Sequence, residues 1–180
     1  KQSGTFNEVA ASYGFTFDKR DRVFMPTSGS IISLGQSLPV YADKPFISNS
    51  LKVSTYKSLN ENVVGSGKIF LTAINGLDDE DVRLSKRKNL GQKRLRGFER
   101  NKVGPLDGSN HIGGNYAAAV NFETNLPNLL PENTKADVGL FLDFGNVWGV
   151  DYDSTIEDSN KIRSTTGAVI NWISPLGPMS

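Results

Sequence analysis

The feature of this sequence that most constrains its fold is a two-residue alternation of apolar with small or polar side chains, repeated along most of the chain. In residues 6–17 the apolar side chains fall on every second position: Val9, Ala11, Tyr13, Phe15 and Phe17. Successive side chains of a β-strand point to opposite faces, so this period predicts a strand whose two faces meet different surroundings. Helical periodicity is hard to find in any segment. The sequence therefore predicts an all-β chain.

Seven segments have the length and pattern of strands: residues 6–17, 30–40, 49–59, 68–77, 114–125, 136–148 and 162–173. The connections between them differ in length. Residues 19–29 and 60–67 have the glycine, proline and polar content of turns, whereas residues 78–113 form a long stretch without clear periodicity. Loops of that length are usually functional or disordered. Short turns alternating with longer loops indicate an antiparallel up-and-down barrel with two unlike ends.

The composition narrows the classes of protein to consider. Apolar residues make up 37% of the 180 residues, which is lean for a soluble core but ordinary where only one face of each strand meets lipid. Cysteine is absent, which excludes a disulfide framework or a thiolate metal site. The net charge of +1 favours no particular partner. No run approaches the roughly 18 apolar residues of a membrane-spanning helix, but barrel strands give a much weaker signal.

The two ends of the sequence predict a piece of a longer protein. The chain begins at Lys1 rather than at a methionine, and it has no signal peptide. It stops at Ser180, just after a predicted turn. We therefore expect residues 1–180 to be a fragment cut at both ends.

The fifth and sixth strands predict two kinds of surface. The apolar face carries Tyr116, Ala118, Val120 and Phe122 on one strand and Val138, Leu140, Leu142 and Phe144 on the other. The polar face includes the small residues Ala117, Ala119, Gly139 and Gly145, which leave room for another segment to pack. Trp148 and Trp172 lie near strand ends, where membrane barrels carry aromatic girdles. A soluble β-sandwich would show the same alternation and stays open as an alternative.

Charges of opposite sign are segregated along the chain. The basic run comprises Arg83, Lys86, Arg87, Lys88, Lys93, Arg94, Arg96, Arg100 and Lys102, and the acidic run comprises Asp137, Asp143, Asp151, Asp153, Glu157 and Asp158. The two runs could hold each other by complementary charge, or both could be solvated surface segments. An anionic lipid or nucleic acid is also a conceivable partner of the basic run. Aromatic residues are not interleaved with it as in a nucleic-acid platform, so no nucleic acid is expected.

Within the basic run, Leu95-Arg96-Gly97-Phe98 carries the strongest functional signal. Glu123 and Asp143 fall on the polar face of consecutive strands, and a guanidinium group has five donors in a planar fork that can satisfy two carboxylates at once. Gly97 permits a close backbone approach or a positive φ. Phe98 would anchor the loop by burial. We predict that Glu123 and Asp143 hold Arg96; a glycosidase-type acid pair is the alternative role for the two carboxylates.

Other catalytic or ligand-binding motifs are incomplete. His111 is the only histidine, which leaves little for a serine triad or a zinc cluster. Residues 64–68 resemble a phosphate-binding loop but lack its first glycine, and Ile69 replaces the magnesium-binding hydroxyl. We therefore predict no catalytic residue, no cofactor and no metal, and a chain that is not an enzyme.

Four short motifs follow one another in a characteristic order: Met25-Pro26-Thr27-Ser28-Gly29, Leu95 to Phe98, Phe141-Leu142-Asp143-Phe144-Gly145, and Ser174-Pro175-Leu176-Gly177-Pro178. This series resembles the barrel domain of the BamA-type outer-membrane assembly factors, in the bacterial surface antigen family. The resemblance implies a sixteen-stranded barrel preceded by POTRA domains. Residues 1–180 would supply strands eight to fourteen and the start of strand fifteen. The POTRA domains and the terminal strands of the barrel would be missing.

The same resemblance implies roles for individual residues. The loop at about residues 78–113 would be an extracellular loop that folds back into the barrel lumen. Its family motif, Val/Ile-Arg-Gly-Phe, is matched by Leu95 to Phe98 with a conservative change at the first position. The lumen partners of the arginine would be Glu123 and Asp143. We expect a functional cluster of Arg96, Gly97, Phe98, Glu123, Asp143 and Gly145.

The function implied by the resemblance is the folding and insertion of other β-barrel proteins into the bacterial outer membrane. The partners would be outer-membrane lipids, unfolded barrel proteins and accessory lipoproteins of the assembly complex. Related translocation-assembly and two-partner-secretion transporters share the loop motif and are one alternative. A secreted soluble β-sandwich hydrolase or binding module that uses the two carboxylates is an alternative of another class.

Overall fold

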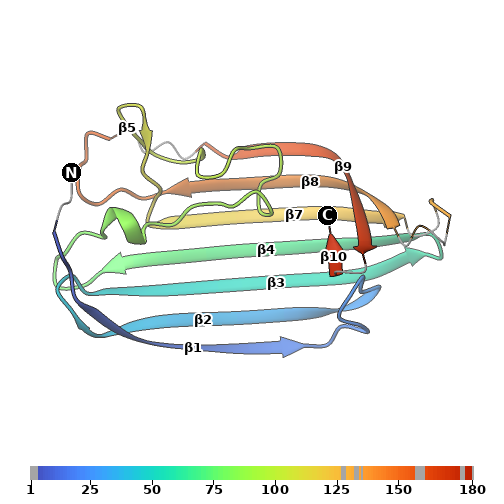
Figure 1. Cartoon of the computed structure of the whole chain (residues 1–180), viewed down its shortest axis with the longest axis horizontal. Coiled ribbons are helices and arrows are strands. Elements are labelled where there is room, and N and C mark those ends of the chain that lie inside the picture. The colour runs from blue at the N-terminus through green and yellow to red at the C-terminus, as the bar shows by residue number, and fades with distance from the viewer. Residues whose placement is uncertain are drawn as a thin grey trace.

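The computed structural model describes residues 4–126, 129–131, 134, 136–156, 161–174 and 177–179. Eight strands form one antiparallel sheet in the order β1-β2-β3-β4-β7-β8-β9-β10 (Figure 1). They are β1 (Glu8–Asp18), β2 (Ser28–Ala42), β3 (Phe46–Asn60), β4 (Val63–Gly76), β7 (Tyr116–Leu126), β8 (Ala136–Trp148), β9 (Arg163–Ser174) and β10 (Gly177–Met179). Neighbours along the chain are neighbours in the sheet, which is the up-and-down order of a barrel wall.

The predicted all-β fold and the seven predicted strands are confirmed, and the three-residue β10 extends the sheet by one strand. Most strand ends differ from the predicted ones by one to three residues, and the largest difference is at the start of β4. Residues 60–67 were expected to be a turn, but β4 already begins at Val63. Gly65 and Gly67 pair with Lys57 and Thr55 of β3 on one side and with β7 on the other. Pairing on both sides therefore overrides the local turn preference of these glycines.

The sheet is curved and open, and the long loop lies across its concave side (Figure 1). The described strands of the main sheet form one layer, so the β-sandwich alternative is wrong. The loop contains one short 3-10 helix, η1 (Leu84–Lys86), and a small hairpin of β5 (Leu106–Asp107) and β6 (Asn110–His111). Within the described residues no helix has the length and apolarity to cross a membrane.

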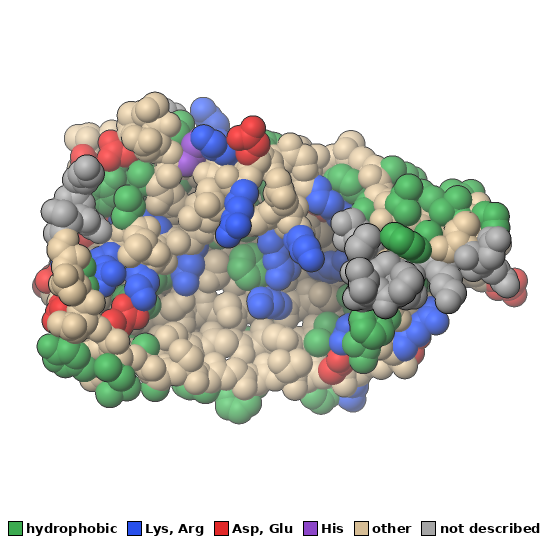
Figure 2. All heavy atoms as spheres, in the orientation of Figure 1, with side chains coloured by type: hydrophobic (Ala, Val, Ile, Leu, Met, Phe, Trp, Pro, Cys, Tyr) green, Lys and Arg blue, Asp and Glu red, His purple; other side chains and the backbone are tan. Residues whose placement is uncertain are grey.

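We call the side of the sheet that faces the loop the inner face and the opposite side the outer face. The outer face exposes large apolar side chains from every long strand: Phe15, Phe17, Ile32, Leu34, Ile69, Leu71, Phe122, Leu140, Leu142 and Ile170 among them. The inner face of β7 and β8 is buried, and Ala117, Ala119 and Val147 on it are almost inaccessible. Figure 2 shows Lys and Arg side chains gathered around the hollow of the concave side. The predicted separation of an apolar and a polar face is confirmed.

The loop and the inner face share one hydrophobic core. Leu90, Leu95 and Val103 of the loop pack with Ala117, Ala119 and Val147 of β7 and β8, and Phe70 and Phe98 lie against this group. The small residues predicted to leave room on the inner face do so at Ala117, Ala119 and Gly145. Gly139 does not face the loop, since a Cβ there would meet the side chains of Val169 and Asn125. Burial of leucine and valine against small side chains therefore fixes the loop over one end of the sheet.

The turn between β1 and β2 is held by the carboxylate of Asp21. The backbone N–H groups of Thr27 and Ser28 donate to it at 3.0 and 3.1 Å, and the Thr27 hydroxyl donates at 2.7 Å. The Thr27 hydroxyl bond is the main reason why the pKa of Asp21 is lowered to about 2. Gly29 follows with a φ of +94°. A Cβ at Gly29 would lie 2.0 Å from the carbonyl oxygen of Lys19.

Gly29→Ala is expected to lower the free energy of unfolding by about 1–3 kcal/mol, because the alanine would adopt a strained φ and collide with the backbone. Gly91→Ala is the matched control, since a Cβ at Gly91 has nothing within 4 Å. Urea titration of the full-length protein in detergent would compare the two variants. Equal unfolding midpoints for Gly29→Ala and Gly91→Ala would contradict the structural account of this turn.

Candidate functional site

The Arg96 side chain extends from the loop to two carboxylates on the inner face of the sheet. Its Nε and Nη2 donate to the two oxygens of Asp143, each at 2.7 Å, and its Nη1 donates to Oε2 of Glu123 at 2.6 Å. The backbone N–H of Arg96 donates to Asp143 Oδ2 at 3.1 Å. Asp143 therefore accepts both parallel bonds of the guanidinium fork, and Glu123 accepts a third bond from its far side. We call Arg96, Glu123 and Asp143 the loop–sheet cluster.

The cluster is largely removed from solvent. The Asp143 side chain is 0% exposed, that of Glu123 is 8% exposed and that of Arg96 is 22% exposed. The guanidinium carbon of Arg96 also lies 3.8 Å from the centre of the Phe141 ring. Planar stacking on an aromatic face and a bidentate carboxylate bond are contacts that arginine makes and lysine does not. The geometry is thus specific for arginine at this position.

Three neighbours of Arg96 shape its surroundings. Gly97 has a φ of +81°, and a Cβ there would lie 3.1 Å from the Thr165 hydroxyl. Phe98 is half-buried and packs against the core beneath the loop. Gly145 lies under the loop, where a Cβ would come within 2.8 Å of Leu90. A larger residue at Gly145 would push Leu90, and with it the loop, away from the sheet.

The structure brings together all six residues of the predicted cluster around one contact between loop and sheet. It also brings in residues that sequence reasoning did not single out. Asn171 donates to Glu123 Oε1 at 3.4 Å, and Lys68 Nζ lies 4.0 Å from Glu123 Oε2. Asn121 donates to the carbonyl oxygen of Arg94 at 2.9 Å. Asn121 and Asn171 fall on inward-facing positions of their strands, as the two carboxylates do. This alternation could have identified them from the sequence.

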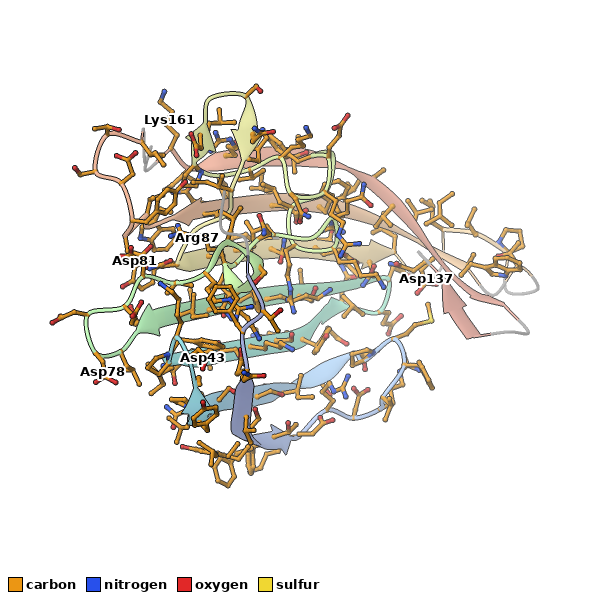
Figure 3. The ribbon with its side chains drawn as sticks, turned by 60° about the vertical axis from the view of Figure 1, so that its left-hand side comes forward. Asp43, Asp78, Asp81, Arg87, Asp137 and Lys161 are labelled. Carbon is orange, nitrogen blue, oxygen red and sulfur yellow. The ribbon has the colours of Figure 1, made fainter. Side chains whose placement is uncertain are left out.

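A second ionic contact closes the base of the loop. The Arg87 side chain is fully buried and pairs with Asp151, which lies in the connection between β8 and β9. Asp151 Oδ2 also accepts the backbone N–H of Val82 at 2.9 Å and the side-chain N–H of Asn115 at 2.8 Å. We call Arg87, Asn115 and Asp151 the loop-base cluster. Figure 3 shows that Arg87 and Asp137 lie toward opposite ends of the sheet.

The predicted attraction between the basic and acidic runs is therefore confirmed at two contacts, Arg87 with Asp151 and Arg96 with Asp143. It does not extend to Asp137 or Asp153. The charged side chain that acts on Asp137 is Arg22, in the turn between β1 and β2. Asp153 bonds instead to Thr155 within its own connection. Glu157 and Asp158 lie outside the described residues.

The pKa of Asp151 reflects a balance of opposing causes. Burial by itself raises the pKa, but the bonds from Asn115 and from the Val82 N–H, together with the charge of Arg87, lower it below its usual value. A carboxyl whose pKa is lowered on folding stabilises the folded state above its unfolded pKa of about 4, and this stabilisation is lost as the pH falls through the folded pKa. The loop-base cluster should therefore loosen in acid.

Asp151→Asn is expected to weaken closure of the loop base by about 1–3 kcal/mol, because the buried Arg87 loses its counter-charge. Hydrogen exchange of the backbone amides of residues 82–88 in the full-length protein would measure the effect. Asp153→Asn, in the same connection, is the control and should exchange like the natural protein. Equal exchange in the two variants at neutral pH, or a difference between them that does not shrink as the pH is lowered, would contradict a role of Asp151 in closing the loop base.

The site offers little for metal or acid–base chemistry. The described residues contain no group of three or more His, Cys, Asp or Glu side chains placed to hold a metal ion. Glu123 and Asp143 are both bonded to one guanidinium group, so neither is free to act as the acid and base of a glycosidase. The arrangement holds a loop in place, which is a structural role.

Comparisons with known proteins agree with this architecture. The family model of the Omp85 superfamily domain matches residues 1–180. The outer membrane protein assembly factor BamA of Neorickettsia risticii (strain Illinois) is 28% identical over 97% of this chain, which covers 24% of that protein. A SAM50-like protein of Schizosaccharomyces pombe is 28% identical over 70% of this chain, which covers 28% of that protein. The chain thus spans about a quarter of the length of these curated relatives.

A solved structure shows the same fold. The crystal structure of BamA from Haemophilus ducreyi lacking POTRA domains 1–3 superposes with a TM-score of 0.83 at 22% sequence identity. The match covers 94% of this chain and 37% of that one. The curved open sheet described above therefore has the same fold as about a third of that BamA chain.

Proposed function

Because this chain belongs to the Omp85 superfamily, we propose that it is part of the wall of an outer-membrane β-barrel that folds and inserts other β-barrel proteins into the outer membrane. The observation that carries the proposal is the loop–sheet cluster, in which Arg96 docks a long loop inside the curved wall. The chain acts without catalysing a covalent reaction. Its partners are outer-membrane lipids, unfolded barrel proteins and accessory lipoproteins of an assembly complex.

The outer face supports a place in the membrane. Leu140 is 54% exposed and Leu142 is 40% exposed on a face that no other described element covers. Such an area of apolar surface is costly in water and favourable against acyl chains. The inner face carries the charges and the loop, as the lumen of a membrane barrel does.

The loop–sheet cluster supports a role in shaping the lumen. A long loop loses conformational entropy when it is ordered, and the three charge-assisted bonds of Arg96 and the leucine contacts beneath it offset that loss. The docked loop stiffens β7, β8 and β9 on the inner face. We infer that this gives the barrel one defined shape while it handles an unfolded substrate, and that residues 1–180 are a partial C-terminal barrel domain.

Reconstitution of the full-length protein in liposomes tests the proposal. Folding of an unfolded outer-membrane barrel protein should be faster in these liposomes than in empty ones, and Asp143→Ala should reduce the gain. Folding at the same rate in both would overturn the proposal.

A related transporter is the second candidate, because the superfamily match does not distinguish it. A transporter barrel would move a secreted polypeptide across the liposome membrane and would leave the folding rate of the barrel protein unchanged. Protection of an added secreted partner from external protease would identify that activity.

A further inference from the structure

The base of the long loop, residues 80–88, is anchored beside β7 and β8. Arg87 pairs with Asp151, and the backbones of Lys88 and Gly114 exchange two hydrogen bonds at 2.7 and 3.0 Å. Figure 1 shows this segment, with its short helix η1, at the end of the sheet where β1 begins and β8 ends. We call this end the mouth of the sheet. Three strands, β2, β3 and β4, separate β1 from β7 there, so a contact from the loop base to β1 spans the mouth.

Two cations of the loop base make that contact. The Lys86 Nζ donates to Oε1 of Glu8 at 2.9 Å and lies 2.8 Å from Oε2. The guanidinium carbon of Arg83 lies 4.3 Å from the centre of the Phe6 ring. Glu8 is the first residue of β1, and the register of β1 shifts directly after the next residue. Because such a bulge bends its strand, the start of β1 is shaped locally and lies against the loop base.

The loop base also contacts the strands between these two sides. Lys44, in the turn between β2 and β3, pairs with Glu80 at 2.7 Å. The Lys88 Nζ donates to the Ser48 hydroxyl of β3 at 2.7 Å. Polar contacts with the loop base therefore follow one another around the mouth, from β1 to the connection after β8.

Lys86 and Arg87 are adjacent in the chain, but their carboxylate partners lie on opposite sides of the mouth. Glu8 belongs to β1, and Asp151 belongs to the connection between β8 and β9. Neighbouring Cα atoms are about 3.8 Å apart, so these two residues cannot follow a large change in the separation of the carboxylates. The curvature of a sheet depends on its bulges and its packing. A short link between the two sides limits how far the sheet flattens.

We propose that Lys86 and Arg87 form a tie across the mouth, and that this tie limits how far β1 and β8 move apart. The Arg87 end is the firm one, because the Arg87 side chain is fully buried. The Lys86 end is the weaker one, because the side chains of Lys86 and Glu8 are 33% and 19% exposed and water competes for their pairing. Release at Glu8 widens the mouth while the loop stays docked at Arg96. Mouth width is a property of the protein without a substrate, so the tie does not depend on the proposed function.

Pulsed EPR of the full-length protein in liposomes measures the width of the mouth. Nitroxide labels are attached at Val40→Cys, near the end of β2, and at Ile162→Cys, just before β9; the two natural residues are 69% and 74% exposed. Glu8→Lys replaces the attraction to Lys86 by a repulsion. The population in the long-distance part of the distribution should then rise roughly two- to tenfold. Glu8→Lys combined with Lys86→Glu restores an ion pair and should return the distribution toward that of the natural protein.

Two further variants separate the tie from a local change in β1. Asp18→Lys makes the same change of charge at the other end of β1, where Asp18 pairs with Arg20 at 2.7 Å, and should leave the distribution unchanged. Phe6→Ala removes the ring beside Arg83 without adding a charge and should cause a smaller shift toward long distances. An unchanged distribution in Glu8→Lys, no recovery in the double variant, or an equal shift in Asp18→Lys would overturn the tie. None of these results depends on the folding of a barrel substrate, so each would leave the proposed function standing.

Discussion

Asp143→Ala is expected to undock the loop and to cost about 3–5 kcal/mol, the penalty for removing one partner of a buried charge pair. The value should lie near the lower end, because the Arg96 side chain keeps 22% of its exposure and can be partly solvated. The loss removes two guanidinium bonds and the backbone bond to Arg96. Hydrogen exchange of residues 90–98 in the full-length protein would show the loop opening, and outer-membrane assembly activity should fall with it.

The remaining members of the cluster allow a stricter test. Arg96→Ala should cost nearly as much as Asp143→Ala, since it leaves the carboxylates buried without a counter-charge. The double variant should cost far less than the sum of the two, because both remove the same contact. Asp137→Ala is the control, because Asp137 lies on the same strand and outside the loop contact. Additive effects, or an effect of Asp137→Ala equal to that of Asp143→Ala, would contradict the cluster.

Leu140→Arg is expected to destabilise the full-length barrel in lipid by about 2–4 kcal/mol, the cost of an arginine at mid-bilayer depth on the outer face of a barrel. Leu140 lies within β8 and is 54% exposed on the apolar face. Urea unfolding of the protein in liposomes would measure the change.

Val169→Arg is the control at a similar depth on the opposite face. Val169 pairs with Gly139, next to the pair of Leu140 with Ala168, and it lines the inner cavity beside Glu123. An arginine there meets a polar, charged space and should cost much less. If Val169→Arg proves worse than Leu140→Arg, the assignment of the two faces to lumen and lipid is reversed.

The strands were predictable because their signal is local. Each strand repeats its pattern every two residues, so β8 was placed at residues 136–148 from the sequence alone. The start of β4 was missed because Gly65 and Gly67 have a local preference for turns, while their pairing depends on β3 and β7 far away in the chain.

The candidate site was predictable in part. The alternation of side chains along the strands placed Glu123 and Asp143 on one face of the sheet. The short motif around Arg96 identified this arginine as their positively charged partner. The loop-base cluster was not predicted, since the pairing of Arg87 with Asp151 depends on how an aperiodic loop folds over the sheet. Any of several neighbouring lysines and arginines was an equal candidate for that carboxylate.

A disulfide between the loop and the barrel wall would show whether the loop is docked against the inner face. Without natural cysteines in this region, Gly97→Cys and Thr165→Cys can be introduced together in the full-length protein and oxidised in membranes. A Cβ at Gly97 lies 4.0 Å from the Cβ of Thr165, within the range that a disulfide bridges. Gly108→Cys with Thr165→Cys is the control, since Gly108 also has a positive φ and has nothing within 4 Å of its Cβ position. We expect a crosslink between positions 97 and 165 and none between 108 and 165; a loop that crosslinks equally from both positions, or from neither, is not docked against the inner face.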